Sequence, residues 1–347
     1  MEEEMLAEKK FYNAVAIATG GELATLHKIK KEYPDWYSAW RKIKAPKIDP
    51  EEEWGKLIAT GTRLLWPDEL PSELLEIAAP PLAIYMKGKL PKNEQRISVV
   101  GTRRATPQAK DLTRGLAREL ARSGVVIVSG LAMGIDTAAH EGALAGGGRT
   151  IAVLANSLDG IYPRQNANLA EKILEGGGAL MSEYPFGSTT FPNRFLERNR
   201  IVAGLSAGTV VVEAPLESGS LVTANLALEA NREVFVIPGL ATHPNYAGSH
   251  KLIRSGARLA VSAGDILEDL NWVTEKDPQA DQLSQSLLLS GVDQKIFEAL
   301  KASVCAVGVD RIQELTQISV LDLNRHLTFL QIKGLVKEQD GRYYINN

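Results

Sequence analysis

The sequence predicts an α/β protein whose main domain is an extended Rossmann-like, doubly wound and mostly parallel sheet. Two observations predict it: short β-branched runs alternate with helix-period segments, and each run is almost continuously apolar. Parallel strands covered by helices on both faces have this unbroken apolar character, and the alternation is typical of βαβ units. The expected strands are residues 97–100, 125–129, 150–155, 179–184, 209–214, 233–239 and 257–262.

Helices are expected between these strands. The clearest one follows the first strand, in the segment PQAKDLTRGLARELARSG. Thr106 is suited to cap its amino end, Pro107 to occupy its first turn and Gly124 to end it. This pattern predicts a surface helix that covers one face of the sheet.

Two smaller regions flank the sheet domain, which we place at residues 76–272. Residues 1–75 are expected to form a helical domain, in which four of the five tryptophans provide an aromatic core rather than a base-stacking surface. After a Gln/Ser/Asp-rich linker, residues 285–347 predict three helices and two strands about an Asp340–Gly341 turn. That order of elements is typical of a winged helix.

Composition excludes several classes of protein. The chain of 347 residues carries a formal net charge of −3, which argues against a generally basic nucleic-acid binder, but residues 96–258 hold 17 Lys/Arg against 13 Asp/Glu. No apolar run is long enough for a membrane span, the acidic start MEEEMLAEKK is unlike a signal peptide, and a single cysteine fits a reducing cytoplasm. We therefore expect a cytoplasmic protein whose anionic partner is held by the middle region, with no metal or cofactor.

Candidate binding residues lie in the loops after the strands, because ligands of open α/β sheets bind at the carboxyl ends of the strands. Glycine and serine turns there can present backbone N–H groups, and arginines can pair with phosphates. The candidates, in chain order, are Gly101, Thr102, Arg103, Arg104, Ser129, Gly130, Tyr162, Arg164, Asn166, Arg194, Arg198, Asn199, Arg200, Ser218, Gly219 and Ser220.

The arrangement favours a ligand with several phosphates. A dinucleotide fingerprint would place glycines where Arg103 and Arg104 stand, and arginines dispersed over three loops suit a polyanion. Tyr162 is a possible platform for base stacking. Neither a GxxxxGK[ST] loop nor a GxSxG elbow is present, so an NTPase and a serine hydrolase are disfavoured.

Other patterns have structural as well as functional interpretations. The stripe Lys110, Arg114, Arg118 and Arg122 fits a solvated helix face. Asp136 and His140 could be a catalytic pair at i, i+4, although capping and packing explain them better, and Glu213 with Glu217 could act in hydrolysis or serve turns. The arginines of FLERNR could tie a helix to the sheet or contact the ligand.

Seven segments, in order over about residues 80–265, resemble the DprA/Smf family of DNA-processing proteins. They are PPLAIYMKGKL, SVVGTRRAT, SGLAMGIDTAAHEGAL, TIAVLANSLDGIYPRQN, RNRIVAGLS, VVVEAPLESGSLVTANLALEANREVFVIPG and GSHKLIRSGA. The resemblance implies a homodimer without catalytic activity that binds single-stranded DNA, protects it and helps load RecA in natural transformation. It also implies a sterile-alpha-motif-like N-terminal domain and a C-terminal winged helix.

The resemblance further implies a binding pocket at Gly101, Thr102 and Arg103, with Arg164 and Arg194 as its other basic residues. Thr102 replaces the family's usual serine and keeps the hydroxyl, whereas Asn156 replaces a usual glycine. Two rival functions remain: a Rossmann-like nucleotide phosphoribohydrolase with Glu213 as acid, although the loop of those enzymes is absent, and a transcriptional regulator that uses the winged helix.

Overall fold

The computed structural model describes residues 2–43, 45–90, 93–188, 190–272, 291–303, 306–332, 335–339 and 341–345. They fall into two compact units, which divide the chain between Trp272 and Val273. The expected linker lies outside the described residues, as does Asp340 of the expected C-terminal turn. No described helix is both long and apolar enough to cross a membrane.

The first unit is built on one sheet of nine strands, in the order β1-β2-β6-β5-β4-β3-β7-β8-β9. All seven predicted strands are present and pair in parallel: β3 (Arg96–Gly101), β4 (Val126–Ser129), β5 (Thr150–Val153), β6 (Ala179–Ser182), β7 (Gly208–Val212), β8 (Glu233–Ile237) and β9 (Arg258–Leu259). Two short antiparallel strands that the sequence analysis missed, β1 (Arg63–Leu65) and β2 (Ile84–Gly88), extend one edge.

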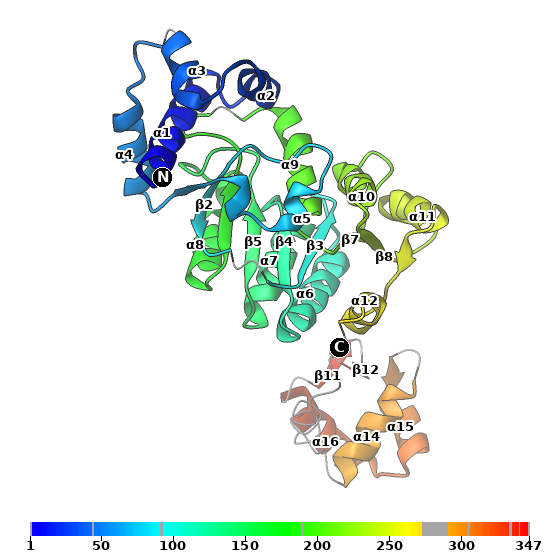
Figure 1. Ribbon diagram of the computed structural model, residues 1–347. Coiled ribbons are helices and arrows are strands. Elements are labelled where there is room, and N and C mark those ends of the chain that lie inside the picture. The colour runs from blue at the N-terminus through cyan, green and yellow to red at the C-terminus, as the bar shows by residue number, and fades with distance from the viewer. Residues whose placement is uncertain are drawn as a thin grey trace. The chain divides into compact units, whose positions relative to one another are not determined.

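Helices cover both faces of the sheet, which confirms the doubly wound α/β fold (Figure 1). One face packs against α6 (Pro107–Arg122), α7 (Ile135–Ala145), α8 (Ala167–Glu175) and α12 (Ala263–Asp269). The other packs against α5 (Ser72–Leu75), α9 (Pro192–Gly204), α10 (Gly219–Glu229) and α11 (Ala247–Arg254). Helix α6 begins as predicted, because the Thr106 hydroxyl accepts a hydrogen bond from the Ala109 N–H at 3.2 Å.

The N-terminal segment contributes α1 (Glu2–Ala18), α2 (Leu23–Glu32), α3 (Trp36–Lys42) and α4 (Pro50–Ala59). Its tryptophans serve as core residues, as expected: Trp36 and Trp54 are buried in a cluster that also contains Tyr85 and Leu180 of the sheet. These helices and the sheet thus share one hydrophobic core. The placement of a domain boundary near residue 75 stays a prediction.

The second unit contains α14 (Val292–Lys301), α15 (Val309–Thr316) and α16 (Val320–Ile332). A small antiparallel sheet accompanies them, formed by β10 (Val307–Gly308), β12 (Arg342–Ile345) and β11 (Val336–Gln339). Leucines and isoleucines of all three helices, with Val336, make a separate core. Three helices followed by two paired strands agree with the expected order of a winged helix, and that assignment remains a prediction.

The order of the parallel strands fixes where a ligand can bind. From β3 the chain moves outward through β4, β5 and β6, and then returns to place β7 on the other side of β3. At such a switch point the two loops that follow the central strands diverge and leave a crevice at the carboxyl ends. The crevice of this protein therefore lies between the loops after β3 and β7.

Candidate functional site

A cavity of about 380 Å³ occupies this crevice. It is lined by residues from the loops after β3 and β7 and from helix α9, which bring together nine of the sixteen predicted site residues. These nine are Gly101, Thr102, Arg103, Arg104, Arg198, Asn199, Ser218, Gly219 and Ser220.

The turn after β3 needs its glycine and its threonine. A Cβ atom on Gly101 would lie 2.0 Å from the Val212 carbonyl oxygen, so no larger residue fits between β3 and β7. The Thr102 N–H donates to the Glu213 carbonyl oxygen at 3.0 Å, and the Thr102 hydroxyl accepts from the Arg104 N–H at 3.2 Å. The turn is fixed by these contacts, and the two arginines after Thr102 are exposed.

Three exposed arginines are free to meet an anion. Among the described residues, the side chains of Arg103, Arg104 and Arg164 form neither an ion pair nor a hydrogen bond with another residue. Arg103 and Arg104 follow β3, and Arg164 lies in the loop after β5, in the 3-10 turn Arg164–Asn166. A guanidinium group offers five N–H donors in a planar fork that matches phosphate oxygens.

An aromatic strip joins these two loops. The guanidinium of Arg103 lies over the ring of Phe195, 4.6 Å from its centroid, and the Phe195 ring lies 5.7 Å from the ring of Tyr162. Tyr162 is 49% exposed. We call Arg103, Phe195 and Tyr162 the aromatic strip.

Phe195 was missed by the sequence analysis, which singled out only the polar residues of FPNRFLERNR. An aromatic residue between arginines, in a segment that follows a strand, is the pattern of a stacking surface, so the signal was present. Its contact with Tyr162 depended on the fold.

Arg198 has a structural position at the base of the cavity. It is 4% exposed, and its Nη1 atom donates to the carbonyl oxygens of Gly130 (2.6 Å) and Val153. The Oδ2 atom of Asp136 accepts from the Gly130 N–H at 3.0 Å, so Gly130 is held from both sides. Burial raises the pKa of Asp136, and the positive charge of Arg198 opposes that rise.

A Cβ atom on Gly130 would lie 2.4 Å from the guanidinium of Arg198, so a larger residue there would displace that buried side chain. The adjacent Ser129 is fully buried, and its hydroxyl donates to the Val99 carbonyl oxygen at 2.7 Å. Both residues therefore shape the floor of the site. Neither is among the residues that line the cavity.

The other two arginines of α9 also meet protein partners. Arg194 is 6% exposed; its Nη2 atom donates to the Gly20 carbonyl oxygen at 2.5 Å, and its guanidinium stacks on Tyr184. The Nη2 atom of Arg200 lies 2.7 Å from both carboxylate oxygens of the buried Glu183. The interpretation that the arginines of FLERNR tie a helix to the sheet thus describes Arg198, whose guanidinium contacts Val153 of β5. Arg200 of the same segment pairs with Glu183, just after β6, and Arg194 precedes the segment.

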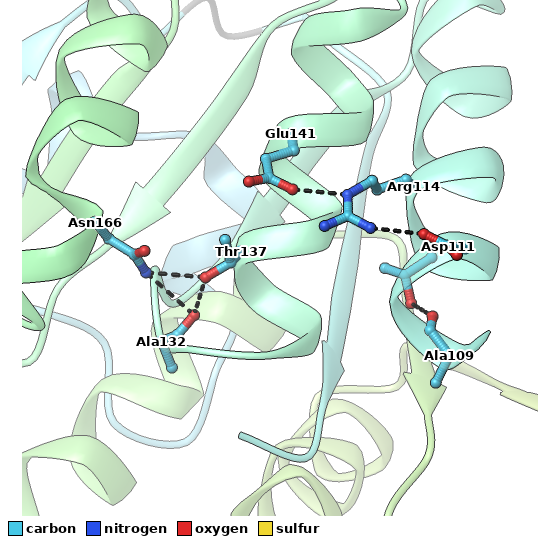
Figure 2. Close-up of polar contacts among 8 residues, drawn as sticks. Ala109, Asp111, Arg114, Ala132, Thr137, Glu141 and Asn166 are labelled. Carbon is cyan, nitrogen blue, oxygen red and sulfur yellow. Dashed lines mark hydrogen bonds and ion pairs between the residues drawn. The ribbon is translucent and has the colours of Figure 1, made fainter. Parts of the chain in front are cut away.

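Asn166 holds two loops together (Figure 2) and is not among the residues that line the cavity. Its Nδ2 atom donates to the Leu131 carbonyl oxygen at 2.8 Å and to the Thr137 hydroxyl at 2.9 Å. The Thr137 hydroxyl in turn donates to the Ala132 carbonyl oxygen at 2.8 Å. Asn166 is 4% exposed and fixes the loop after β4 against the loop that carries Arg164.

The loop after β7 supplies the amino end of α10. The Ser218 hydroxyl accepts from the Ser220 N–H at 3.3 Å and caps the helix. Across the cavity, the Asn199 Nδ2 atom lies 3.4 Å from the Gly219 carbonyl oxygen. The free N–H groups of a helix start favour an anion. This wall of the cavity is therefore suited to the same kind of ligand as the arginines opposite.

The candidate catalytic groups are occupied by structural contacts. The Nδ1 atom of His140 hydrogen-bonds the Thr150 hydroxyl at 2.6 Å, and burial lowers the pKa of His140 to about 3. Glu213 is fully buried; its carboxylate accepts from the Thr106 N–H at 2.8 Å and from the Asn245 side chain at 2.5 Å. Capping and packing, rather than a catalytic pair, describe these residues.

The basic stripe of α6 agrees with a solvated helix face. Arg114 is paired with Asp111 on its own helix and with Glu141 of α7, both at 2.8 Å (Figure 2). Its side chain is 42% exposed.

Comparisons with known proteins identify the family of the chain. Residues 62–271, more than half of the chain, match the family DNA recombination-mediator protein A. Protein Smf of Escherichia coli is 44% identical over 279 residues, which cover 79% of this chain and 74% of that protein. Protein Smf of Synechocystis is 36% identical over 317 residues, which cover 81% and 79% of the two chains.

Solved structures resemble the chain in fold as well as in sequence. The X-ray structure of DNA processing protein A (DprA) from Streptococcus pneumoniae matches 67% of this chain and 80% of that one, with 36% identity and a TM-score of 0.60. The DNA processing protein A of Helicobacter pylori, whose structure describes its single-stranded DNA binding mode, matches 60% and 95%, with 33% identity and a TM-score of 0.55. The predicted family is confirmed: the chain belongs to the DNA recombination-mediator protein A family, also named DprA or Smf.

Proposed function

We propose that the protein is a cytoplasmic recombination mediator that binds single-stranded DNA across the cavity and the aromatic strip. One observation carries the proposal: three exposed arginines that form no ion pair or side-chain hydrogen bond among the described residues stand on the loops after β3 and β5, and Phe195 joins these loops through its contacts with Arg103 and Tyr162. Arginines would bind the phosphates, and Phe195 with Tyr162 would stack on bases. The contribution of the remaining predicted site residues is to shape the turns and the floor beneath.

A single strand suits this surface better than a duplex. Stacking on Tyr162 requires a base whose face is free, and paired bases in a duplex do not offer one. The described arginines of the site would contact phosphates, which carry no sequence information, so binding should be independent of sequence. The single-stranded DNA binding mode described for the Helicobacter pylori relative supports the proposal.

The test is a salt titration of the affinity for oligothymidylate and for a single strand of mixed sequence, followed by fluorescence anisotropy. Arg103→Ala and Arg164→Ala should each weaken binding and reduce the slope of log affinity against log salt by about 0.7 for each phosphate that the variant no longer binds. Arg122, an exposed arginine at the other end of α6, gives a matched control, and Arg122→Ala should change neither quantity. Unchanged affinity and slope in both site variants would place the DNA elsewhere.

Homodimer formation and RecA loading are the finer parts of the proposal. Exposed apolar side chains at the β9 edge of the sheet support the first: Leu259 of β9 and Val261 just after it are 52% and 66% exposed, and Leu240, after the neighbouring β8, is 73% exposed. Exposed apolar side chains at a strand edge are suited to pairing with a second copy. Analytical ultracentrifugation of the wild type and of Val261→Glu would test whether the protein is a dimer.

The rate of RecA filament formation on single-stranded DNA, measured with and without the protein, would test loading.

We propose no catalytic reaction for this site. The phosphoribohydrolase alternative needs Glu213 as an acid, yet that carboxylate is buried and accepts hydrogen bonds from Thr106 and Asn245. Nucleoside monophosphates and ATP should therefore not be hydrolysed. Turnover that Glu213→Gln abolishes would favour the enzyme, and a preference for duplex DNA would favour the transcriptional regulator.

A further inference from the structure

Arg194 is an arginine of the site region that binds the protein's own backbone. It belongs to the first turn of α9, and among residues 191–196 it alone is buried. Its Nη2 atom donates to the Gly20 carbonyl oxygen at 2.5 Å, across 174 positions of sequence. Phe191 and Leu196, on either side, are each 50% exposed. The start of α9 is therefore anchored chiefly through Arg194.

The partner of Arg194 is the tight turn between α1 and α2. Gly20 and Gly21 both have positive φ, 66° and 71°, a conformation that favours glycine. A Cβ atom on Gly21 would lie 2.6 Å from Pro185 Cδ and 3.4 Å from the Tyr184 ring. The turn thus packs directly on the loop that leads from β6 into α9.

A second contact links the same turn to α9. The Tyr184 ring, which Gly21 approaches, carries the Arg194 guanidinium at 4.3 Å from its centroid. The Tyr184 hydroxyl donates to the Glu197 carboxylate of α9 at 2.8 Å. Tyr184 and Arg194 therefore connect the N-terminal turn to the first two turns of the helix.

Phe195 follows Arg194 directly and forms the centre of the aromatic strip, in contact with both Arg103 and Tyr162. We propose that the α1–α2 turn is a positioning element of the DNA site: by accepting the Arg194 hydrogen bond it fixes the first turn of α9, and with it the ring of Phe195. Arg194 is then a positioning residue and not a phosphate ligand. This inference rests on the proposed function.

The rival role for Arg194 has a structural basis. Its Nη1 atom is buried and has no hydrogen-bond partner among the described residues, so a small opening of the turn would free one N–H group for a phosphate. The two roles differ in salt dependence, because only a phosphate contact releases counterions. A salt titration of the variant therefore separates them.

The experiment measures the affinity for labelled oligothymidylate over a series of salt concentrations. Arg194→Ala should weaken binding about fivefold, the lower end of the value of one base–aromatic contact, with the salt slope unchanged. Arg232 gives a matched control: its Nη2 atom also donates to a backbone carbonyl, that of Glu73, and it precedes β8, at the opposite ends of the strands. Arg232→Ala should leave affinity and slope unchanged.

A double-mutant cycle tests the route through Phe195. If Arg194 acts by placing that ring, Phe195→Ala should cost much less affinity in the Arg194→Ala background than in the wild type. Gly21→Ala, which forces the turn away from Pro185, should reproduce the effect of Arg194→Ala. Thermal unfolding followed by tryptophan fluorescence would confirm that each variant is folded.

Two results would overturn the inference while leaving the proposed function in place. One is a salt slope that falls by about 0.7 in Arg194→Ala, which marks a phosphate contact. The other is additivity of Arg194→Ala and Phe195→Ala. Wild-type affinity in both Arg103→Ala and Phe195→Ala would instead refute the proposed DNA site itself, and the inference with it.

Discussion

Two groups of arginines surround the switch point of the sheet, and they differ in what they contact. Arg103, Arg104 and Arg164 stand on loops, are exposed and have no ion pair or side-chain hydrogen bond among the described residues. The arginines of α9 are largely buried and contact carbonyl oxygens or a carboxylate of the protein. Both groups consist of arginines, so the role of each one depends on whether protein groups already occupy its guanidinium or leave it open to a phosphate.

The comparison explains how a DNA site can be both charged and rigid. A loop arginine can exchange water for phosphate on binding, and its removal should affect affinity and salt dependence. A buried arginine already has its hydrogen bonds within the protein, and its removal leaves buried groups without partners. Stability and binding should therefore respond to different arginines.

The largest effect is expected for Arg198→Ala. The substitution leaves the buried Asp136 without its countercharge and removes donors from the carbonyl groups of Gly130 and Val153. We expect the free energy of unfolding to fall by about 3–5 kcal/mol. Urea denaturation followed by tryptophan fluorescence is suitable, because all five tryptophans belong to the first unit.

Arg103→Ala is the matched variant for this measurement. Its side chain is exposed, so its removal should change the free energy of unfolding by less than about 0.5 kcal/mol. A decrease of several kcal/mol in Arg103→Ala, or an unchanged stability in Arg198→Ala, would break the division between the two groups.

A smaller decrease in the free energy of unfolding is expected when the pH is lowered, because His140 is then protonated. Burial, and secondarily the charge of Arg198, lowers the pKa of His140 from 6.5 to about 3. A base with a lowered folded-state pKa contributes stability that is present above pH 6.5 and lost as the pH falls toward 3. At pH 5 the decrease should be about 2 kcal/mol.

His140→Asn provides the comparison, since the asparagine amide can donate to the Thr150 hydroxyl as the imidazole Nδ1–H does. Unfolding free energies of both proteins should be measured between pH 7 and pH 5. The wild type should lose about 2 kcal/mol more than the variant over this range. Equal decreases would show that His140 does not titrate as its burial implies.

The sequence predicted the sheet well because its strands have a strong local signal. Residues 97–100 and 209–214 are mostly apolar, as is typical of strands buried on both faces, and they appear as β3 and β7. β1 has only three residues, whereas β2 lies in an apolar run, residues 82–86, that the sequence analysis overlooked. They are short antiparallel strands beside the proline-rich connector, and their pairing is set by the edge of the sheet.

The candidate site was predicted less completely, for a physical reason. The loops that form the cavity follow from strand order, so Gly101, Arg103 and Ser218 could be located from the sequence. The contact of Arg194 could not be predicted from the sequence, because its acceptor is the backbone carbonyl of Gly20, which no pattern of side chains reveals. Phe195 had a sequence signal, but its stacking partners Arg103 and Tyr162 come from separate loops.

The smallest effect, on the affinity for single-stranded DNA, is expected from removal of the C-terminal unit. Here too, the charges that are available to a phosphate decide the contribution. Residues 291–347 hold seven Lys/Arg and seven Asp/Glu. Asp322, at the start of α16, accepts from the Ser319 hydroxyl at 2.7 Å, while its N–H donates to the same hydroxyl at 3.2 Å. A carboxylate tied into the start of this helix would repel a DNA backbone where a recognition helix normally makes its first contacts.

Arg311 is paired with Glu314, whereas Arg325 and Arg342 are exposed and could add weak contacts. A chain ended at Ser290 retains the whole first unit, with the cavity and the aromatic strip. Its affinity for single-stranded DNA should change by less than about twofold, because a region without net charge releases few counterions. Abolished binding on truncation, together with tight duplex binding by residues 291–347, would move the DNA site to the second unit and leave the loop arginines without a role.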